Sequence, residues 1–208
     1  MNSIATAILI AIRRGYPVKY FITIFFLFVL TIMLGCSSTG PHSYTSPAIG
    51  LGYIKSIAVL PLENFSKEKG GAERTRELLI TRLLGLGLYD IVEQGELHRF
   101  LRDEVRSKEK ALIDQTIAKR MAREFAIQAY ISGSIDDYRE IRNGSYTYPV
   151  IAATLRMVDI KTGQVIWQAS ADESGYSTAG RLFGLSSEGT NKVLFRLIDK
   201  LLRTMGDS

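Results

Sequence analysis

The chain has 208 residues, a formal net charge of +5, 46% hydrophobic residues and one cysteine. Residues 1–35 contain three basic residues and no acidic one, so the net charge of the remainder falls by three to +2. So small a charge, with no basic stripe interleaved with aromatic residues, argues against nucleic-acid binding, and residues 36–208 have the length of one domain with a substantial core.

The single cysteine, Cys36, ends an uncharged apolar run that begins at Tyr20. Gly35 precedes it and two serines follow, so small residues surround the thiol, although Leu34 stands where a small residue is more usual. This pattern is typical of a bacterial lipoprotein signal. We therefore predict a signal peptide over residues 1–35, cleavage between Gly35 and Cys36, and N-palmitoyl and S-diacylglycerol groups on Cys36.

The alternative is an uncleaved membrane anchor. The run from Tyr20 to Gly35 has 16 residues, whereas a spanning helix needs about 20 and the apolar region of a signal peptide has about 7–15. Length therefore favours the signal. A second apolar stretch, residues 1–12, precedes it. A translation start at Val18 would remove that stretch, a hypothesis that N-terminal sequencing of the unprocessed precursor tests.

The segment 36–53 begins with the cysteine that is expected to be lipidated. Its other residues are rich in Ser, Thr, Gly and Pro, a composition that predicts a flexible tether. A folded periplasmic domain is expected over residues 54–206. It begins with a buried strand at 54–62, where apolar and β-branched residues end at a proline. A helix over 72–84 follows, which Gly85 and Gly87 are expected to stop.

The middle of the domain is expected to contain a strand at 88–93 and two further helices. The first spans 96–105, and the second starts near Asp114, whose side chain suits an N-cap. Three strands follow at 126–138, 146–160 and 164–171, joined by turns at Asn143-Gly144 and at 161–163. They predict a meander.

The last helix shows the clearest periodicity, with apolar residues from Leu194 to Met205 at helical spacing. The whole order is β-α-β-α-α-β-β-β-α. It predicts a single α/β domain with a mixed five-stranded sheet faced by helices.

Residues for catalysis are scarce. The two histidines, His42 and His98, lie in different predicted segments without a partner, so neither a nucleophile–base pair nor a zinc site is indicated. The carboxylates at 136, 137 and 140, and at 172 and 173, are interpreted as solvated strand ends, and Trp167 as a core or sheet residue. We expect no enzyme activity, no cofactor, no metal and no small-molecule substrate.

Four stretches from residue 57 onward resemble the CsgG family of curli-secretion lipoproteins and the related periplasmic domains at the N-terminus of TolB and in the penicillin-binding-protein activator LpoB. They are IAVLP at 57–61, IVEQGEL at 91–97 leading into LRDE at 101–104, YISGSI at 130–135, and LRMVDIKTGQVIW at 155–167. The resemblance implies a TolB-N/CsgG-like α/β domain that acts through protein contacts and carries no catalytic residues.

The expected function is that of an outer-membrane lipoprotein facing the periplasm, a non-enzymatic assembly or accessory factor that binds an envelope protein. Ser37 fits this destination, because an aspartate after the lipidated cysteine is the usual inner-membrane retention signal. One alternative is a curli-type oligomeric secretion channel, which the charged residues of 136–142 disfavour as membrane strands. Others are an activator of a penicillin-binding protein and an uncharacterised hydrolase. Partner identity and homo-oligomer formation stay open.

Overall fold

The computed structural model describes Thr23, Phe26, residues 40–105, 113–177, Leu182 and residues 186–206. The chain divides into two units, 1–39 and 40–208, and the elements below belong to the second. The predicted cleavage and lipidation residues, Gly35 and Cys36, lie outside the described residues. Among the residues that are described, no helix combines the length and apolar character that a membrane crossing requires.

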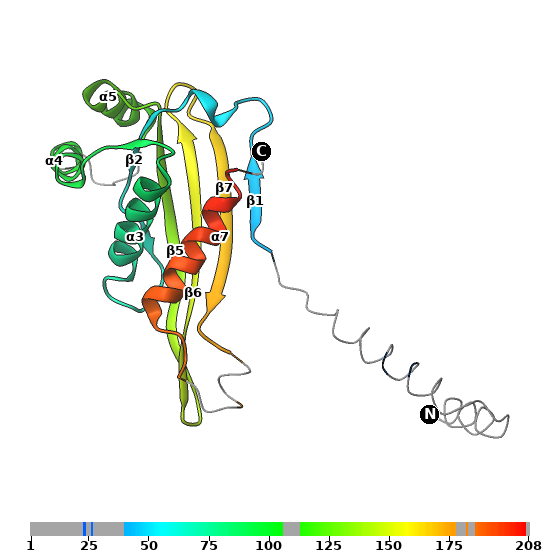
Figure 1. Cartoon of the computed structure of the whole chain (residues 1–208). Helices are drawn as coiled ribbons and strands as arrows, with labels where there is room; N and C mark the ends of the chain where they lie inside the picture. Colours follow the sequence, from blue (N-terminus) through cyan, green and yellow to red (C-terminus); the bar gives the residue numbers. More distant parts are fainter. Residues whose placement is uncertain are drawn as a thin grey trace, which may run out of the picture. The chain divides into compact units, whose positions relative to one another are not determined.

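The elements follow the predicted order, with additions. They are β1 (His42–Thr45), the 3-10 helix η1 (Leu51–Tyr53), β2 (Ser56–Val59), β3 (Glu63–Asn64), α3 (Gly71–Leu86), β4 (Asp90–Ile91), α4 (Gln94–Val105), α5 (Gln115–Phe125), β5 (Ala129–Asn143), β6 (Tyr146–Asp159), β7 (Val165–Ser174) and α7 (Thr190–Arg203). The predicted α/β class is confirmed (Figure 1).

The sheet is mixed and has seven strands in the order β1-β7-β6-β5-β2-β4, with β3 pairing β5. Strand β5 pairs antiparallel with β6, β6 with β7, and β7 with β1, and the β5-β6-β7 part of this order confirms the predicted meander. Strand β2 runs parallel to β4 and β5, and β3 runs parallel to β5. The two strands beyond the predicted five, β1 and β3, have four and two residues, too few to show a periodic pattern.

The segment expected to be a flexible tether is structured from residue 42 onward. His42–Thr45 pairs antiparallel with β7, from His42 opposite Ser170 to Thr45 opposite Trp167, and Ser46 N–H donates to Ile166 O at 2.9 Å. The prediction of a tether to residue 53 is therefore wrong here. Composition alone suggested flexibility, but the open backbone edge of β7 gives these residues hydrogen-bond partners.

Helix boundaries shift by a few residues from those predicted. Helix α3 continues through Gly85 to Leu86, and its C-cap residue, Gly87, adopts the left-handed conformation with φ 61°. Gly87 alone therefore stops the helix, as a C-terminal glycine commonly does. Asp114 caps α5 as predicted, and its carboxylate accepts a hydrogen bond from Ile117 N at 2.8 Å.

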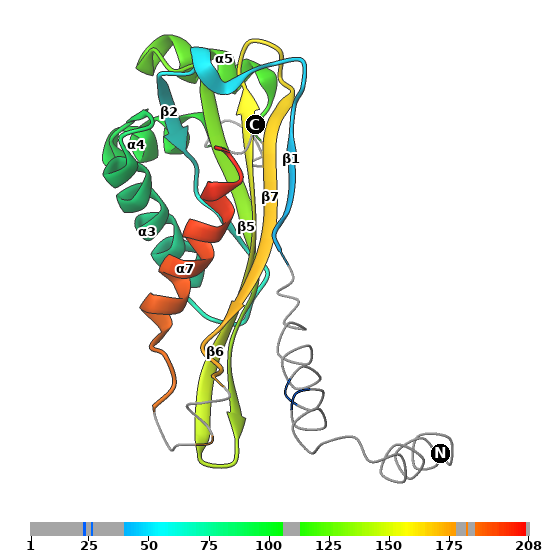
Figure 2. The same cartoon turned by 45° about the vertical axis from the view of Figure 1, so that its right-hand side comes forward.

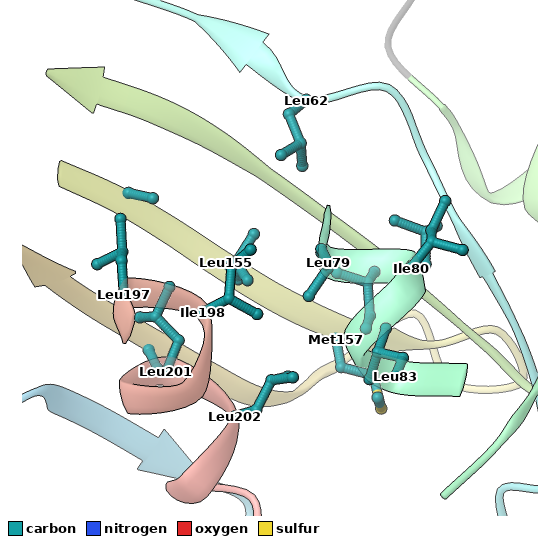
Figure 3. Close-up of a cluster of buried hydrophobic side chains, with 14 of the residues drawn as sticks. Leu62, Leu79, Ile80, Leu83, Leu155, Met157, Leu197, Ile198, Leu201 and Leu202 are labelled. Atoms are coloured by element: carbon teal, nitrogen blue, oxygen red, sulfur yellow. The ribbon is translucent and has the colours of Figure 1, made fainter. Parts of the chain in front are cut away.

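The main core lies between the sheet and the helices α3 and α7, which cover the same face (Figures 1 and 2). Leu79 and Leu83 of α3 and Leu197 and Leu201 of α7 are fully buried there. Figure 3 shows them together with the sheet residues Leu155 and Met157 and others of this cluster. The alternate apolar positions of the strands thus face these two helices.

A second, smaller cluster lies on the other face, at the end of the sheet near β2. Ala58 and Leu60 alternate with the residues that face α3, and they pack with Leu97 of α4 and Met121 of α5. This part of β2 is therefore buried on both faces. Helices α4 and α5 leave the remainder of that second face uncovered.

Candidate functional site

The candidate site is the part of the sheet that none of the described helices covers, which we call the open face. Direct cross-strand neighbours point to the same side of a sheet, so the strand register defines it as two rows of side chains. One row is polar and crosses five strands: His42, Ser170, Thr154, Ser134 and Glu63. The adjoining row crosses four strands: Tyr44, Gln168, Arg156 and Ser132.

Hydrogen bonds between strands hold the polar side chains of the open face in position. Thr154 Oγ1 donates to Asp136 Oδ2 at 2.7 Å and lies 2.9 Å from Ser170 Oγ. Ser134 Oγ donates to the other oxygen of Asp136 at 2.6 Å. Because these side chains are tied to one another, the surface is arranged before any partner binds, which reduces the entropy cost of association.

Arg156 lies within the open face and remains exposed, with Nε donating to Ser132 Oγ at 3.0 Å. Its guanidinium retains donors for a partner. Tyr130, half-buried next to the cluster beneath α4 and α5, has its pKa raised by burial, while the charge of Arg156 acts in the opposite direction. Arg156 therefore lies close to the boundary between the covered and the open parts of this face.

Two exposed aromatic side chains lie at the edges of this surface: Tyr44, at the β1 end of the second row, and Phe65, which flanks the open face just beyond β3. Their side chains are 52% and 69% exposed, respectively. Phe65 and Arg156 line a shallow depression of about 200 Å³. That volume is below the roughly 300–1,000 Å³ typical of small-molecule sites. Exposed aromatics around an arginine instead match the composition of protein interfaces.

Gly133 is the one position of β5 in this region where the chain has no side chain. A Cβ at Gly133 would lie 2.1 Å from the carbonyl oxygen of Thr154. The glycine of the YISGSI stretch therefore allows close approach of β5 and β6 beneath the open face.

The polar residues named from the sequence are dispersed in the structure. His42 is exposed on the open face, whereas His98 is exposed on α4. Asp136 accepts hydrogen bonds within the sheet, Asp137 pairs with Arg139 at 3.2 Å, and Glu173 pairs with Arg196 at 2.7 Å. These carboxylates thus have internal partners.

Within the described ranges, no group of three His, Cys, Asp or Glu residues is placed to hold a metal ion. Trp167 is fully buried in the main core. The sequence reasoning passed over Tyr44, Phe65 and Arg156. The sequence does contain a signal for this surface, because polar residues alternate with apolar ones along three neighbouring strands and so mark one polar face of the sheet. These polar residues are Ser132 and Ser134, Thr154 and Arg156, and Gln168 and Ser170.

Comparisons with known proteins identify relatives of this fold. The family model of the peptidoglycan-synthase activator LpoB matches residues 49–172. The chain is similar to the PelC dodecamer from Paraburkholderia phytofirmans, with a TM-score of 0.55 and 19% identity over 79% of this chain and 95% of that one. It is also similar to lipoprotein GNA1162 from Neisseria meningitidis, with a TM-score of 0.54 and 16% identity over 74% and 99%. No curated protein gave a significant match.

At these identities the structural likenesses show the fold alone. Together with the family model, they support an LpoB-like fold. The resemblance found in the sequence named LpoB as a related domain, but it named the CsgG family first, and the comparisons give no support to the CsgG assignment. The CsgG assignment rested on short apolar motifs that related α/β domains share. Because the matched segment spans more than half of the sequence, the chain belongs to the family of the peptidoglycan-synthase activator LpoB.

Proposed function

We propose that the protein is a non-enzymatic activator of a peptidoglycan synthase, anchored to the outer membrane by lipid on Cys36 and facing the periplasm. The observation that carries the proposal is the family match over residues 49–172. The open face supports it, because a pre-arranged polar surface flanked by exposed aromatics suits a protein partner. The expected lipoprotein signal supports the location.

Activation in this proposal needs binding only. An activator raises the activity of a synthase by binding its active conformation more tightly than its inactive one. Arg156 would donate charge-assisted hydrogen bonds to the synthase, and Tyr44 and Phe65 would supply apolar contact area. The polar network around Asp136 and Thr154 would keep the strands in register beneath these contacts.

The test uses the purified lipidated protein and a purified penicillin-binding protein from the same cell, with glycan-strand synthesis as the readout. We expect the wild type to stimulate synthesis. Arg156→Glu and Phe65→Ser should abolish most of the stimulation, because Arg156 is exposed on the open face and Phe65 is exposed at its edge. The matched control is Lys119→Glu, a charge reversal at an exposed position of α5.

Two results would contradict the proposal. One is synthesis at the same rate with and without the wild-type protein. The other is undiminished stimulation by both the Arg156→Glu and the Phe65→Ser variants, which would show that the synthase does not bind at the open face. The mass of the same preparation in mild detergent completes the test. The mass of a stable ring-shaped oligomer would favour the secretion-channel alternative. The mass of the unmodified precursor would show that Cys36 carries no lipid and would contradict the proposed anchor.

A further inference from the structure

We propose that the protein docks onto anionic lipid head groups through the exposed side of the layer formed by α3 and α7. This inference rests on the lipid anchor of the proposed function, but it concerns a different surface from the open face. We call this surface the helix face. It consists of Lys55, Arg82, Leu84, Leu86, Leu88, Lys192, Phe195, Arg196, Lys200 and Arg203.

The first support is the short length of chain between the anchor and the fold. The sheet begins at His42, opposite Ser170, and only residues 37–40 lie between Cys36 and Pro41, so that five Cα–Cα steps join these two residues. Fully extended, these steps span about 18 Å. A domain held on so short a connection stays at the membrane surface and must present one side to it.

The second support is the position of Pro41, where this connection meets the domain. Pro41 lines a hollow of about 590 Å³ whose other walls include Lys192, Lys200 and Arg203 of α7. The chain therefore enters the fold beside the basic side of α7. The short connection brings this side close to the lipid head groups.

The third support is charge. Basic residues recur along one side of α7 at spacings of four, four and three residues: Lys192, Arg196, Lys200 and Arg203. Glu188 forms ion pairs with Lys192, at 2.7 Å, and with Arg196. Glu173 forms ion pairs with Arg196, at 2.7 Å, and with Lys200, at 3.2 Å.

The hydrogen bonds and ion pairs to Lys192 and Arg196 lower the pKa of Glu188, so this carboxylate stays charged. Arg82 pairs with Asp199, so with Lys55 and Arg82 included the helix face has six basic side chains and three carboxylates, of Glu173, Glu188 and Asp199. The excess positive charge complements anionic head groups.

The fourth support is a group of exposed leucines at the end of α3. Leu84, Leu86 and Leu88 are 57%, 40% and 49% exposed. Leu86 and Leu88 line a pocket of about 390 Å³ that shares Arg203 and Asp199 with the hollow beside Pro41. The two depressions therefore adjoin each other at Asp199 and Arg203 of α7.

Basic side chains surround the pocket of the leucines, namely Lys55, Arg82 and Arg203. Projecting apolar residues within a basic surround are the arrangement by which proteins lie in a membrane interface. The leucines would enter the head-group region, and the cations would contact the phosphates. Docking in this way leaves the open face, on the opposite side of the sheet, accessible to a protein partner.

The experiment uses the full lipidated protein reconstituted in vesicles of phosphatidylethanolamine and phosphatidylglycerol, and in matched vesicles of phosphatidylcholine. A water-soluble amine-reactive ester labels exposed lysines, and mass spectrometry gives the extent at each one. We expect labelling of Lys55 and Lys192 to fall several-fold in the anionic vesicles relative to the neutral ones. Lys119, exposed on α5, should label equally in both.

Variants test the same surface. The double change Leu88→Ser with Arg203→Glu should restore labelling of Lys55 and Lys192 in anionic vesicles. Arg123→Glu, at an exposed position of α5, is the matched control and should leave the protection intact. Fluorescence of the buried Trp167 reports whether each variant is folded.

The outcomes separate this inference from the proposed function. Equal labelling in both vesicle types, with lipid on Cys36 and intact synthase stimulation, would overturn docking and leave the activator proposal standing. Protection without stimulation would support docking and contradict the activator. Protection that persists in detergent, with an oligomeric mass, would show that a second copy covers the helix face and would overturn docking. Absence of lipid on Cys36 would remove its premise.

Discussion

Trp167 on β7 and Thr204 after α7 form a buried hydrogen bond, with the indole Nε1 donating to Thr204 Oγ1 at 2.9 Å. The hydroxyl of Thr204 donates in turn to Leu201 O at 2.7 Å. The pair therefore fixes the end of α7 to the sheet and satisfies the indole N–H inside the core.

Thr204→Val tests this pair, since it keeps the side-chain shape and removes the acceptor. We expect a loss of about 1–3 kcal/mol in the free energy of unfolding, because the buried indole N–H loses its partner. Urea unfolding followed by fluorescence of Trp167 measures it. Thr147→Val, at an exposed position of β6, should stay within about 0.5 kcal/mol of the wild type. Equal stability of both variants would show that the hydrogen bond contributes nothing.

Gly133→Ala should destabilise the fold by about 1–3 kcal/mol, because the new Cβ would lie 2.1 Å from Thr154 O. The matched control is Gly85→Ala, inside α3, where a Cβ meets nothing within 4 Å. That change should stabilise by about 0.5–1 kcal/mol, since alanine favours the helix. Thermal unfolding of both variants gives the signs. A Gly133→Ala protein as stable as the wild type would contradict the close approach of β5 and β6.

Arg76 of α3 is a buried charge that ties the helix to the end of β2. Its Nε and Nη2 donate to Val59 O at 3.1 and 2.8 Å, and the residue is 5% exposed. We expect Arg76→Met to cost about 1.5–3 kcal/mol, the range for hydrogen bonds to charged groups. Arg74→Met, at an exposed position of the same helix, is the control. Stability unchanged in Arg76→Met would mean that packing of the methylene stem, not the guanidinium, holds the residue.

Tyr53 should make the fold sensitive to alkaline pH. Burial, together with the hydrogen bond to Asp159 and the charge of that carboxylate, raises the pKa of Tyr53 from 10.0 to about 12. The folded state thus holds this proton more tightly than the unfolded state. The stabilisation is complete below pH 10 and is lost as the pH rises to about 12.

Denaturant unfolding across this pH interval measures the effect. The free energy of unfolding should fall less steeply with pH in Tyr53→Phe than in the wild type, because the variant has no phenol to titrate there. Tyr44→Phe, at an exposed position of β1, provides the comparison. Parallel slopes for wild type and Tyr53→Phe would show that the Tyr53–Asp159 hydrogen bond does not affect folding.

Local signals in the sequence were sufficient for most elements. The apolar spacing around Leu194, Leu197 and Leu201 predicted α7, and all three side chains are buried. The N-cap at Asp114 was predicted because a cap needs only a side chain three residues from its N–H group. Turns at Gly144 and Gly163, both with positive φ, were predicted for a similar local reason.

Contacts between distant residues decided the rest. Strand β1 exists because the edge of β7 offers partners to residues 42–45, which their composition does not reveal. The buried position of Arg76 depends on Val59, 17 residues away. The sequence by itself determined the helices, the meander and the likeness to a family of envelope lipoprotein domains. Tertiary structure decided which polar residues share the open face and which cations share the helix face, because strand register and helix packing, not sequence proximity, bring those side chains together.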